Sequence, residues 1–272
     1  MFASPALNLA ENGHFGTTVI ETENSPLTRI NERTYWVMPL FLLNVSAAFE
    51  AFGASVFTMR LVSVFWGLIL LAAWYFIVLK LSGNQNVALL CLALLAGDYT
   101  ILDTASSGRM DTMSAALGFA ALAVFLNLRE RNFLQSVAFS QTLVALSGLT
   151  HPMGILAFLG LLFLTLYFDF RRLSLKIVGV AAIPYLIGGA AFGWWIAQDF
   201  EAFRAQFINN ALMSGRTGGL SAPLSAIWRE FIERYPHAFG LGFNSSGHSG
   251  PIYLKRLILL GYVVGLGGIL LI

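Results

Sequence analysis

Apolar stretches of membrane-spanning length alternate with short polar connections along most of this chain. A helix that crosses the hydrocarbon of a bilayer needs about 17 to 25 apolar residues, and several stretches after residue 56 come near that length. We predict spans at 57–80, 86–102, 112–128, 134–150, 152–169, 175–197 and 256–272. This pattern predicts an all-α protein, built as a polytopic bundle of transmembrane helices.

The same pattern divides the chain into four parts. Residues 1–56 form a polar arm with one shorter apolar stretch, and residues 57–197 hold a six-helix transmembrane core. Residues 198–255 form a long loop, and residues 256–272 begin a further transmembrane helix.

The shorter apolar stretch, residues 36–52, is not counted as a span because it is short and contains Asn44 and Glu50. We expect an amphipathic helix lying in the membrane interface, with its apolar side in lipid and both polar side chains in water. Apolar residues also recur at helical spacing in 200–207 and 227–232. These two segments either form further interfacial helices or pack against other loops.

Composition agrees with a membrane location. Hydrophobic residues make up 57% of the chain and charged residues only 11%, whereas about 25% of an average soluble domain is charged. The net charge of +2 comes from scattered basic residues, which argues against nucleic-acid binding. The single cysteine, Cys91, lies in an apolar run, so the chain cannot form an internal disulfide or a cysteine metal site.

Basic residues gather in alternate connections, which predicts the orientation. Short loops rich in Lys and Arg stay on the cytoplasmic side, and this rule applies to the connections holding Lys80, Arg129 and Arg131, and Arg171, Arg172 and Lys176. The segment 98–111, the turn at His151, the loop 199–256 and the N-terminal arm then lie outside. Because an external arm requires a further span before Met1, and because the chain stops within an apolar run, we expect an incomplete chain.

Charged side chains are concentrated at one outer mouth of the predicted spans. The segment from Gly97 to Thr112 contains Asp98, Asp103, Arg109 and Asp111. Arg109 can hold a phosphate through two hydrogen bonds, and Asp111 stands at a helix start, where polar ligands gather. The alternative is that Asp111 only caps its helix while Arg109 pairs with it or extends toward water.

His151 precedes Pro152 in a second outer turn. A single histidine before a proline is commonly a helix cap or a surface group, but the topology places this one on the same side as Arg109 and Asp111. The other histidines, His14, His237 and His248, show no metal-ligand spacing on a helix. We therefore predict no specific metal site, and the sequence leaves open whether the activity uses a divalent metal.

Three segments together resemble a known family. ASPALNLAENGHFGT (3–17), the stretch from RTYWVMPLF to LLAAWYF (33–76) and SSGRMDTMSAALGFAALAVF (106–125) are similar in order to the amino-terminal half of polytopic glycosyltransferases with the C-type (GT-C) fold. These include the protein O-mannosyltransferases of glycosyltransferase family 39, the aminoarabinose transferases that act on lipid A, and the bacterial Rgt-like sugar transferases. The resemblance covers nearly all of residues 3–200.

The resemblance implies an enzyme that takes a sugar from a polyprenyl-phosphate carrier and passes it to a protein, lipid or glycan acceptor on the outer face. It implies a multi-pass protein of a bacterial plasma (inner) membrane, with a periplasmic or extracellular active face. By similarity, Arg109, Asp111 and His151 would contribute to the site of the donor phosphate. Tyr35 and Pro39 match the aromatic-proline part of the family's first outer loop, which contacts substrate.

One departure from the family concerns the catalytic base. In the family an acidic residue follows the leading span, and the corresponding position falls just before Met1. The catalytic residue is therefore unknown here, with Asp111 and His151 as supporting candidates. Glu11 is the nearest acid, but it lies too far along the chain to replace the base directly. We accordingly expect this chain alone to be inactive.

Two other classes of function fit the pattern of spans. A transporter would need polar or broken helices at mid-membrane, and Gly188, Gly189 and Gly193 mark the one place where a break is suggested. A non-catalytic membrane subunit would need no base at all. The sequence does not identify the sugar, the acceptor, the length of the carrier lipid or the oligomeric state.

Overall fold

The computed structural model describes residues 3–17, 19, 27–214, 222–239, 241 and 252–270. Helices account for nearly all of the regular structure in these ranges. Their bounds are α1 (Ala3–Asn12), α2 (Pro39–Phe52), α3 (Val56–Ser82), α4 (Gln85–Ala96), α5 (Tyr99–Ser106), α6 (Met110–Leu128), α7 (Phe133–Thr150), α8 (Gly154–Asp169), η1 (Phe170–Arg172), α9 (Leu175–Ala197), α10 (Phe200–Phe203), η2 (Arg204–Asn209), α11 (Asn210–Met213), α13 (Pro223–Arg229), η3 (Glu230–Arg234), α14 (Tyr235–Ala238) and α15 (Ile252–Leu270).

Five helices in the described ranges, α3, α6, α7, α8 and α9, are long and apolar enough to cross a membrane. They match five of the spans predicted from the sequence within a few residues. The prediction of an all-α fold with several long apolar helices is therefore confirmed, and the fold is compatible with a multi-pass membrane protein. Helix α9 runs without a break from Leu175 to Ala197, so its glycines do not interrupt it.

The predicted span at 86–102 is wrong as a single straight helix. The chain instead forms α4 and α5, which meet at an angle of 62°. The Asp98 side chain accepts a hydrogen bond from the backbone N–H of Thr100 and so caps α5. A capping carboxylate satisfies a backbone donor at a new helix start, which explains why the helix begins again at this point.

The predicted start of a further helix at 256–272 is partly confirmed, because α15 covers Ile252–Leu270. This helix packs beside α4. The Ile258 side chain lies close to Gly97, and Gly261 approaches Leu94, while the Tyr262 hydroxyl donates to Asp98 over 3.3 Å.

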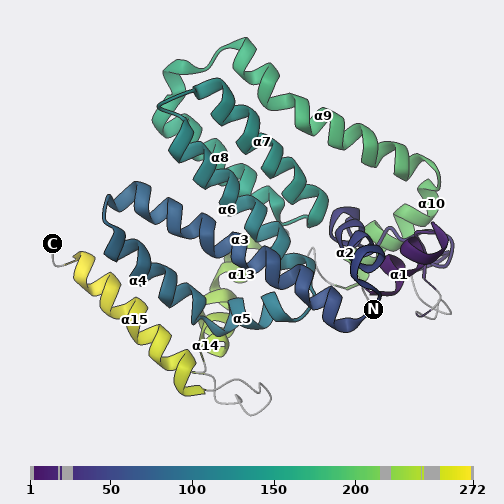
Figure 1. The fold of residues 1–272 in the computed structure, drawn as a ribbon, viewed down its shortest axis with the longest axis horizontal. Coiled ribbons are helices and arrows are strands. Elements are labelled where there is room, and N and C mark those ends of the chain that lie inside the picture. Colours follow the sequence, from purple (N-terminus) through teal and green to yellow (C-terminus); the bar gives the residue numbers. More distant parts are fainter. Residues whose placement is uncertain are drawn as a thin grey trace.

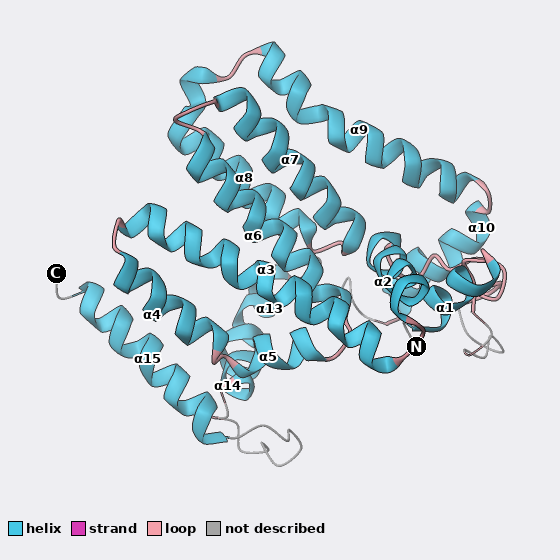
Figure 2. Cartoon of the chain, viewed as in Figure 1, coloured by secondary structure: helices cyan, strands magenta, loops and turns pink. Residues whose placement is uncertain are grey.

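Helices α6 and α7 form the centre of the bundle. Helix α6 contacts α3, α7 and α8, and α7 also contacts α8 and α9. Figures 1 and 2 show these long helices as a fan from α9 through α7, α6 and α3 to α4 and α15. In α6 and α7, 56% and 50% of the apolar window is buried, whereas none of the α9 window is. Helix α9 therefore presents most of its surface to the surroundings of the protein.

Helix α2 is short, as predicted, but its apolar side does not face lipid. Phe41, Leu42, Val45 and Phe49 are buried in a cluster that includes residues of α1, α3 and α7. The expectation of lipid contact is therefore wrong for these four side chains, although Leu43 and Phe52 of the same helix are exposed. An amphipathic pattern marks a helix face that leaves water, but it does not distinguish lipid from protein as the material that covers it.

The segment 200–213 is helical, and its buried face packs against another loop. Gln206 is fully buried; its Oε1 accepts from the backbone N–H of Tyr35 over 2.7 Å. The Nε2 of Gln206 donates to the carbonyls of Thr28 and Arg33, each over 2.9 Å. Of the two predicted alternatives, packing against a loop thus describes this segment. In the helical segment 223–238, Ile227, Trp228, Phe231 and Ile232 are exposed.

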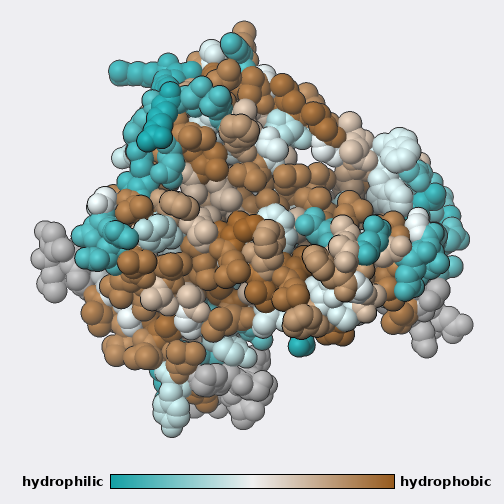
Figure 3. All heavy atoms as spheres, in the orientation of Figure 1, coloured by the Kyte–Doolittle hydropathy of each residue, from teal (hydrophilic) through white to brown (hydrophobic). Residues whose placement is uncertain are grey.

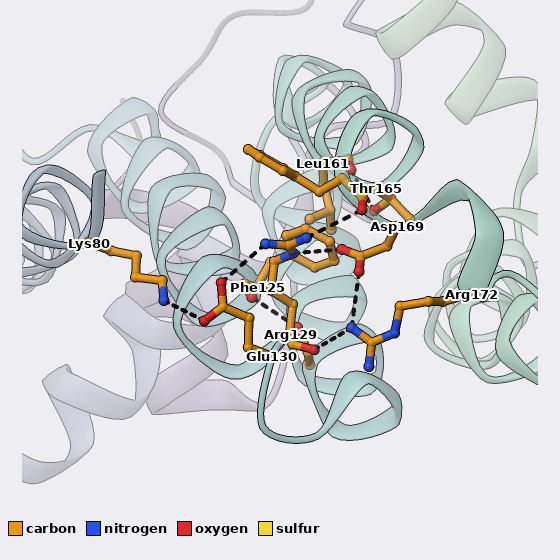
Figure 4. Close-up of polar contacts among 10 residues, drawn as sticks. Lys80, Phe125, Arg129, Glu130, Leu161, Thr165, Asp169 and Arg172 are labelled. Carbon is orange, nitrogen blue, oxygen red and sulfur yellow. Dashed lines mark hydrogen bonds and ion pairs between the residues drawn. The ribbon is translucent and has the colours of Figure 1, made fainter. Parts of the chain in front are cut away.

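The connections predicted to be cytoplasmic meet at one end of the bundle, which we call the basic end. Arg129 and Arg172 both pair with the Asp169 carboxylate, over 2.6 and 3.0 Å, and Lys80 pairs with Glu130 over 2.9 Å. Figure 4 shows Asp169 between the two arginines. The Lys80 ammonium lowers the pKa of the Glu130 carboxyl. Three connections far apart in sequence are thereby tied together.

The surface separates into an apolar middle and two polar ends. In Figure 3, hydrophilic residues gather at the upper left, where α8 and α9 join, and at the right, over α1 and α10. Hydrophobic residues cover most of the surface between them in this view. A broad exposed apolar belt between polar ends is typical of a membrane-embedded helix bundle.

Candidate functional site

Three side chains singled out in the sequence come together at the end of the bundle opposite to the basic end. The Nε of Arg109 lies 2.8 Å from Oδ2 of Asp111. The other carboxylate oxygen, Oδ1, lies 3.8 Å from Nε2 of His151. Asp111 therefore stands between an arginine, to which it is hydrogen-bonded, and a histidine.

The backbone fixes Arg109 and Asp111 at the start of α6. Arg109 is the residue before the first turn of α6, and its carbonyl accepts from the Ser63 hydroxyl of α3 over 3.2 Å. Gly108 has φ of +72°, a conformation that costs a residue with a side chain about 1 kcal/mol. Asp111 lies in the first turn, where the helix dipole favours a negative charge.

His151 is held by the end of α7. Its Nδ1 accepts from the backbone N–H of Met153 over 3.1 Å. Because Nδ1 accepts this hydrogen bond, the neutral ring carries its proton on Nε2, the atom that faces Asp111. The side chain is 21% exposed, so water or a ligand can reach it.

A cavity of about 320 Å³ opens beside these residues, between α6, α7 and α8. Asp111 and His151 lie on its wall together with Ser114 and Ser147, whose hydroxyls are 3.0 Å apart. The remaining wall is mainly apolar and includes Phe119 and Leu122. A pocket of this size with a few converging polar groups is typical of a small-ligand site.

The two serines were not selected from the sequence. Ser114 follows Asp111 by three residues, a spacing that places both on one face of a helix, and this signal could have identified it. Ser147 comes from another helix, and nothing local in its sequence pointed to the cavity. Arg109 and Asp111 also pair with each other, as the alternative interpretation predicted.

The other outer acids are separate from this cluster. Asp98 caps α5 and accepts from Tyr262 of α15, and Asp103 is exposed on α5. Glu11 is exposed in the last turn of α1. In the described part of the chain, no hydrogen bond or ion pair joins Glu11 to the cluster.

Tyr35 and Pro39 support the fold and do not line the cavity. Tyr35 is 1% exposed, and its hydroxyl donates to the Trp195 carbonyl over 2.9 Å. Burial raises the pKa of this phenol. Pro39 is the first residue of α2, where its missing N–H costs nothing. Tyr35 therefore binds the leading loop to the end of α9 instead of lining the cavity.

The histidines outside the cluster do not form a metal site within the described ranges. His14 contacts the carbonyl of Asn31 over 2.7 Å, and His237 lies in α14. His248 falls outside the described residues. Among the residues that the structure describes, no three His, Cys, Asp or Glu side chains are grouped as metal ligands would be.

Comparison with known proteins gives no match: no family model, no curated protein and no solved structure is similar to the chain. The resemblance to the C-type glycosyltransferases stays a prediction. The function has to be argued from the cluster and its surroundings.

Proposed function

We propose that the chain belongs to a membrane glycosyltransferase of the C-type fold, which moves a sugar from a polyprenyl-phosphate donor to an acceptor at the outer face of a bacterial plasma membrane. The observation that carries this proposal is that Asp111 and His151 line a cavity with an otherwise mainly apolar wall, while Arg109 pairs with Asp111 beside it. To bind a polyprenyl phosphate, a site needs cationic or N–H donors for the phosphate and an adjacent apolar surface for the polyprenyl chain.

Each side chain has a role in this proposal. The Asp111 pair uses only the Nε of Arg109, so the two terminal NH2 groups of the guanidinium make no other ion pair with the described residues. These groups would hold two phosphate oxygens in the bidentate manner typical of arginine. The Nε2–H of His151 would donate to a third oxygen, while Asp111 holds Arg109 and the backbone N–H of Met153 holds the imidazole.

The first test measures the affinity of the whole chain, in lipid nanodiscs, for a polyprenyl phosphate. Arg109→Ala should weaken binding about thirty-fold, because a hydrogen bond to a charged group contributes about 1.5 to 3 kcal/mol. A fluorescent polyprenyl phosphate displaced by the unlabelled lipid provides the measurement.

The matched control is Arg60→Ala. Arg60 is an exposed arginine in the first turns of α3, at the same end of the bundle, but unlike Arg109 it makes no ion pair with Asp111. Its variant should bind the lipid as the wild type does. Equal affinity of the wild type and the Arg109→Ala variant would contradict the proposed site. Uptake of free sugar into vesicles that depends on Arg109 would instead support a transporter.

A further inference from the structure

A second and larger cavity lies on the other side of the core, as a groove of about 780 Å³ between α7, α8 and α9. Helix α7 forms its floor, and α8 and α9 form its sides, since both pack on α7. The groove begins near Leu173 and Ile177 at the basic end and extends along α7 past Gly148 to Pro152 at the opposite turn. It therefore runs lengthwise along the bundle.

The wall of the groove offers almost no hydrogen-bonding groups to an occupant. Its two largest polar side chains bond to each other, because the Tyr185 hydroxyl donates to Oε1 of Gln141. The Thr165 hydroxyl donates to the carbonyl of Leu161 over 2.7 Å. An occupant that brings polar groups into the groove would find few partners there, whereas a hydrocarbon chain would need none.

The groove is long enough to hold an acyl chain of one leaflet of a bilayer. Its floor extends from Val137 to Gly148, which corresponds to about 16 Å along a helix that rises 1.5 Å per residue. The hydrocarbon core of a bilayer is about 30 Å thick, so one leaflet contributes about 15 Å. The part of the groove over α7 is thus long enough for one extended acyl chain, and its lining continues to Pro152 and Gly154 at the opposite end.

Cations stand at the end of the groove near Leu173. Arg172 is held by Asp169, but Arg171 and Lys176 are exposed and make no ion pair with any described residue. Phe170 and Leu175, beside them, are 67% and 92% exposed. Exposed basic groups next to exposed apolar ones are typical of the boundary between headgroups and hydrocarbon.

We propose that this groove binds one acyl chain of an anionic phospholipid, whose phosphate lies against Arg171 and Lys176. The charge of the connection and the apolar wall fit the two halves of such a lipid. A second copy of the chain fits less well, because a two-fold axis along the membrane normal would bring the same cations of both copies to one level. The proposal does not depend on the glycosyltransferase function.

Native mass spectrometry of the whole chain in detergent, titrated with phosphatidylglycerol or phosphatidylcholine, tests the headgroup. The wild type should retain phosphatidylglycerol in preference to phosphatidylcholine. Each basic group near a membrane surface contributes about five-fold to binding an anionic lipid. The double variant Arg171→Gln, Lys176→Gln should therefore bind phosphatidylglycerol about 25-fold more weakly, with phosphatidylcholine unchanged.

Arg131→Gln is the control, because it removes the same kind of exposed charge from the basic end but lies on the α6–α7 connection. It should retain phosphatidylglycerol within about two-fold of the wild type. If Arg131→Gln weakens binding as much as the double variant does, the loss of affinity comes from the overall surface charge of the basic end. That result would overturn the proposed site.

The groove itself is tested by filling it. Ala182 lines the groove, whereas the neighbouring Ile183 does not and is 50% exposed. Ala182→Phe should release the bound phosphatidylglycerol, while Ile183→Phe should retain it. Retention of phosphatidylglycerol by both variants would contradict the proposal that the acyl chain binds in this groove. A change from dimer to monomer in Ala182→Phe, with lipid binding intact, would show that a second copy occupies the groove.

Discussion

Replacing Asp169 with Asn is expected to lower the free energy of unfolding by about 3 kcal/mol. The Asp169 side chain is only 1% exposed and pairs with both Arg129 and Arg172. The uncharged amide would leave the Arg129 guanidinium, itself 14% exposed, beside only the more distant Glu130 carboxylate at 3.4 Å. Removing one partner of a buried ion pair leaves an uncompensated charge, which costs more than the pair contributed.

This prediction can be measured by unfolding the chain in mixed micelles and following circular dichroism. Glu130→Gln serves as the control, because Glu130 is 60% exposed and its pair with Lys80 is screened by water. The control should unfold almost as the wild type does. If Asp169→Asn unfolds together with the control, the network in Figure 4 does not stabilise the basic end.

Replacing Gln206 with Leu, at the opposite end of the bundle, should lower the free energy of unfolding by a similar amount, about 3 kcal/mol. The substitution removes the bonds from Gln206 to Thr28, Arg33 and Tyr35 and leaves the buried backbone N–H of Tyr35 without its partner. Each unsatisfied buried group costs about 1 to 3 kcal/mol. Because these bonds join segments more than 170 residues apart in sequence, the leading loop should also become more accessible to proteases.

Gln198→Leu provides the comparison, since Gln198 is exposed at the end of α9. Limited proteolysis should cut the Gln206→Leu variant in the loop 27–35 faster than the wild type, and the Gln198→Leu variant at the wild-type rate. Equal rates for all three proteins would show that Gln206 does not fix this loop.

Long helices of this protein could be predicted because their signal is local. The predicted spans 134–150 and 175–197 agree closely with α7 and α9, since uninterrupted apolar runs determine them. The break between α4 and α5 was missed because apolarity averaged over 86–102 conceals one capping side chain, Asp98. Local composition also could not show that protein, and not lipid, covers α2.

The candidate site was predicted in part for the same reason. Arg109 and Asp111 are neighbours in sequence, and the alternation of loops placed His151 at their end of the bundle. The serines of the cavity, the buried position of Tyr35 and the Asp169 network depend on contacts between distant segments. Such contacts follow from the packing of whole helices, which hydropathy and spacing do not specify.

Everything proposed for Arg109, Asp111 and His151 requires that their end of the bundle faces the compartment opposite to the basic end. Single cysteines on a Cys91→Ala background test this directly, with Met153→Cys beside the cluster and Arg131→Cys at the basic end, both at exposed positions. In sealed vesicles, an impermeant maleimide should label Met153→Cys only from the outer face and Arg131→Cys only from the inner face. Labelling of both cysteines from one face would contradict the account.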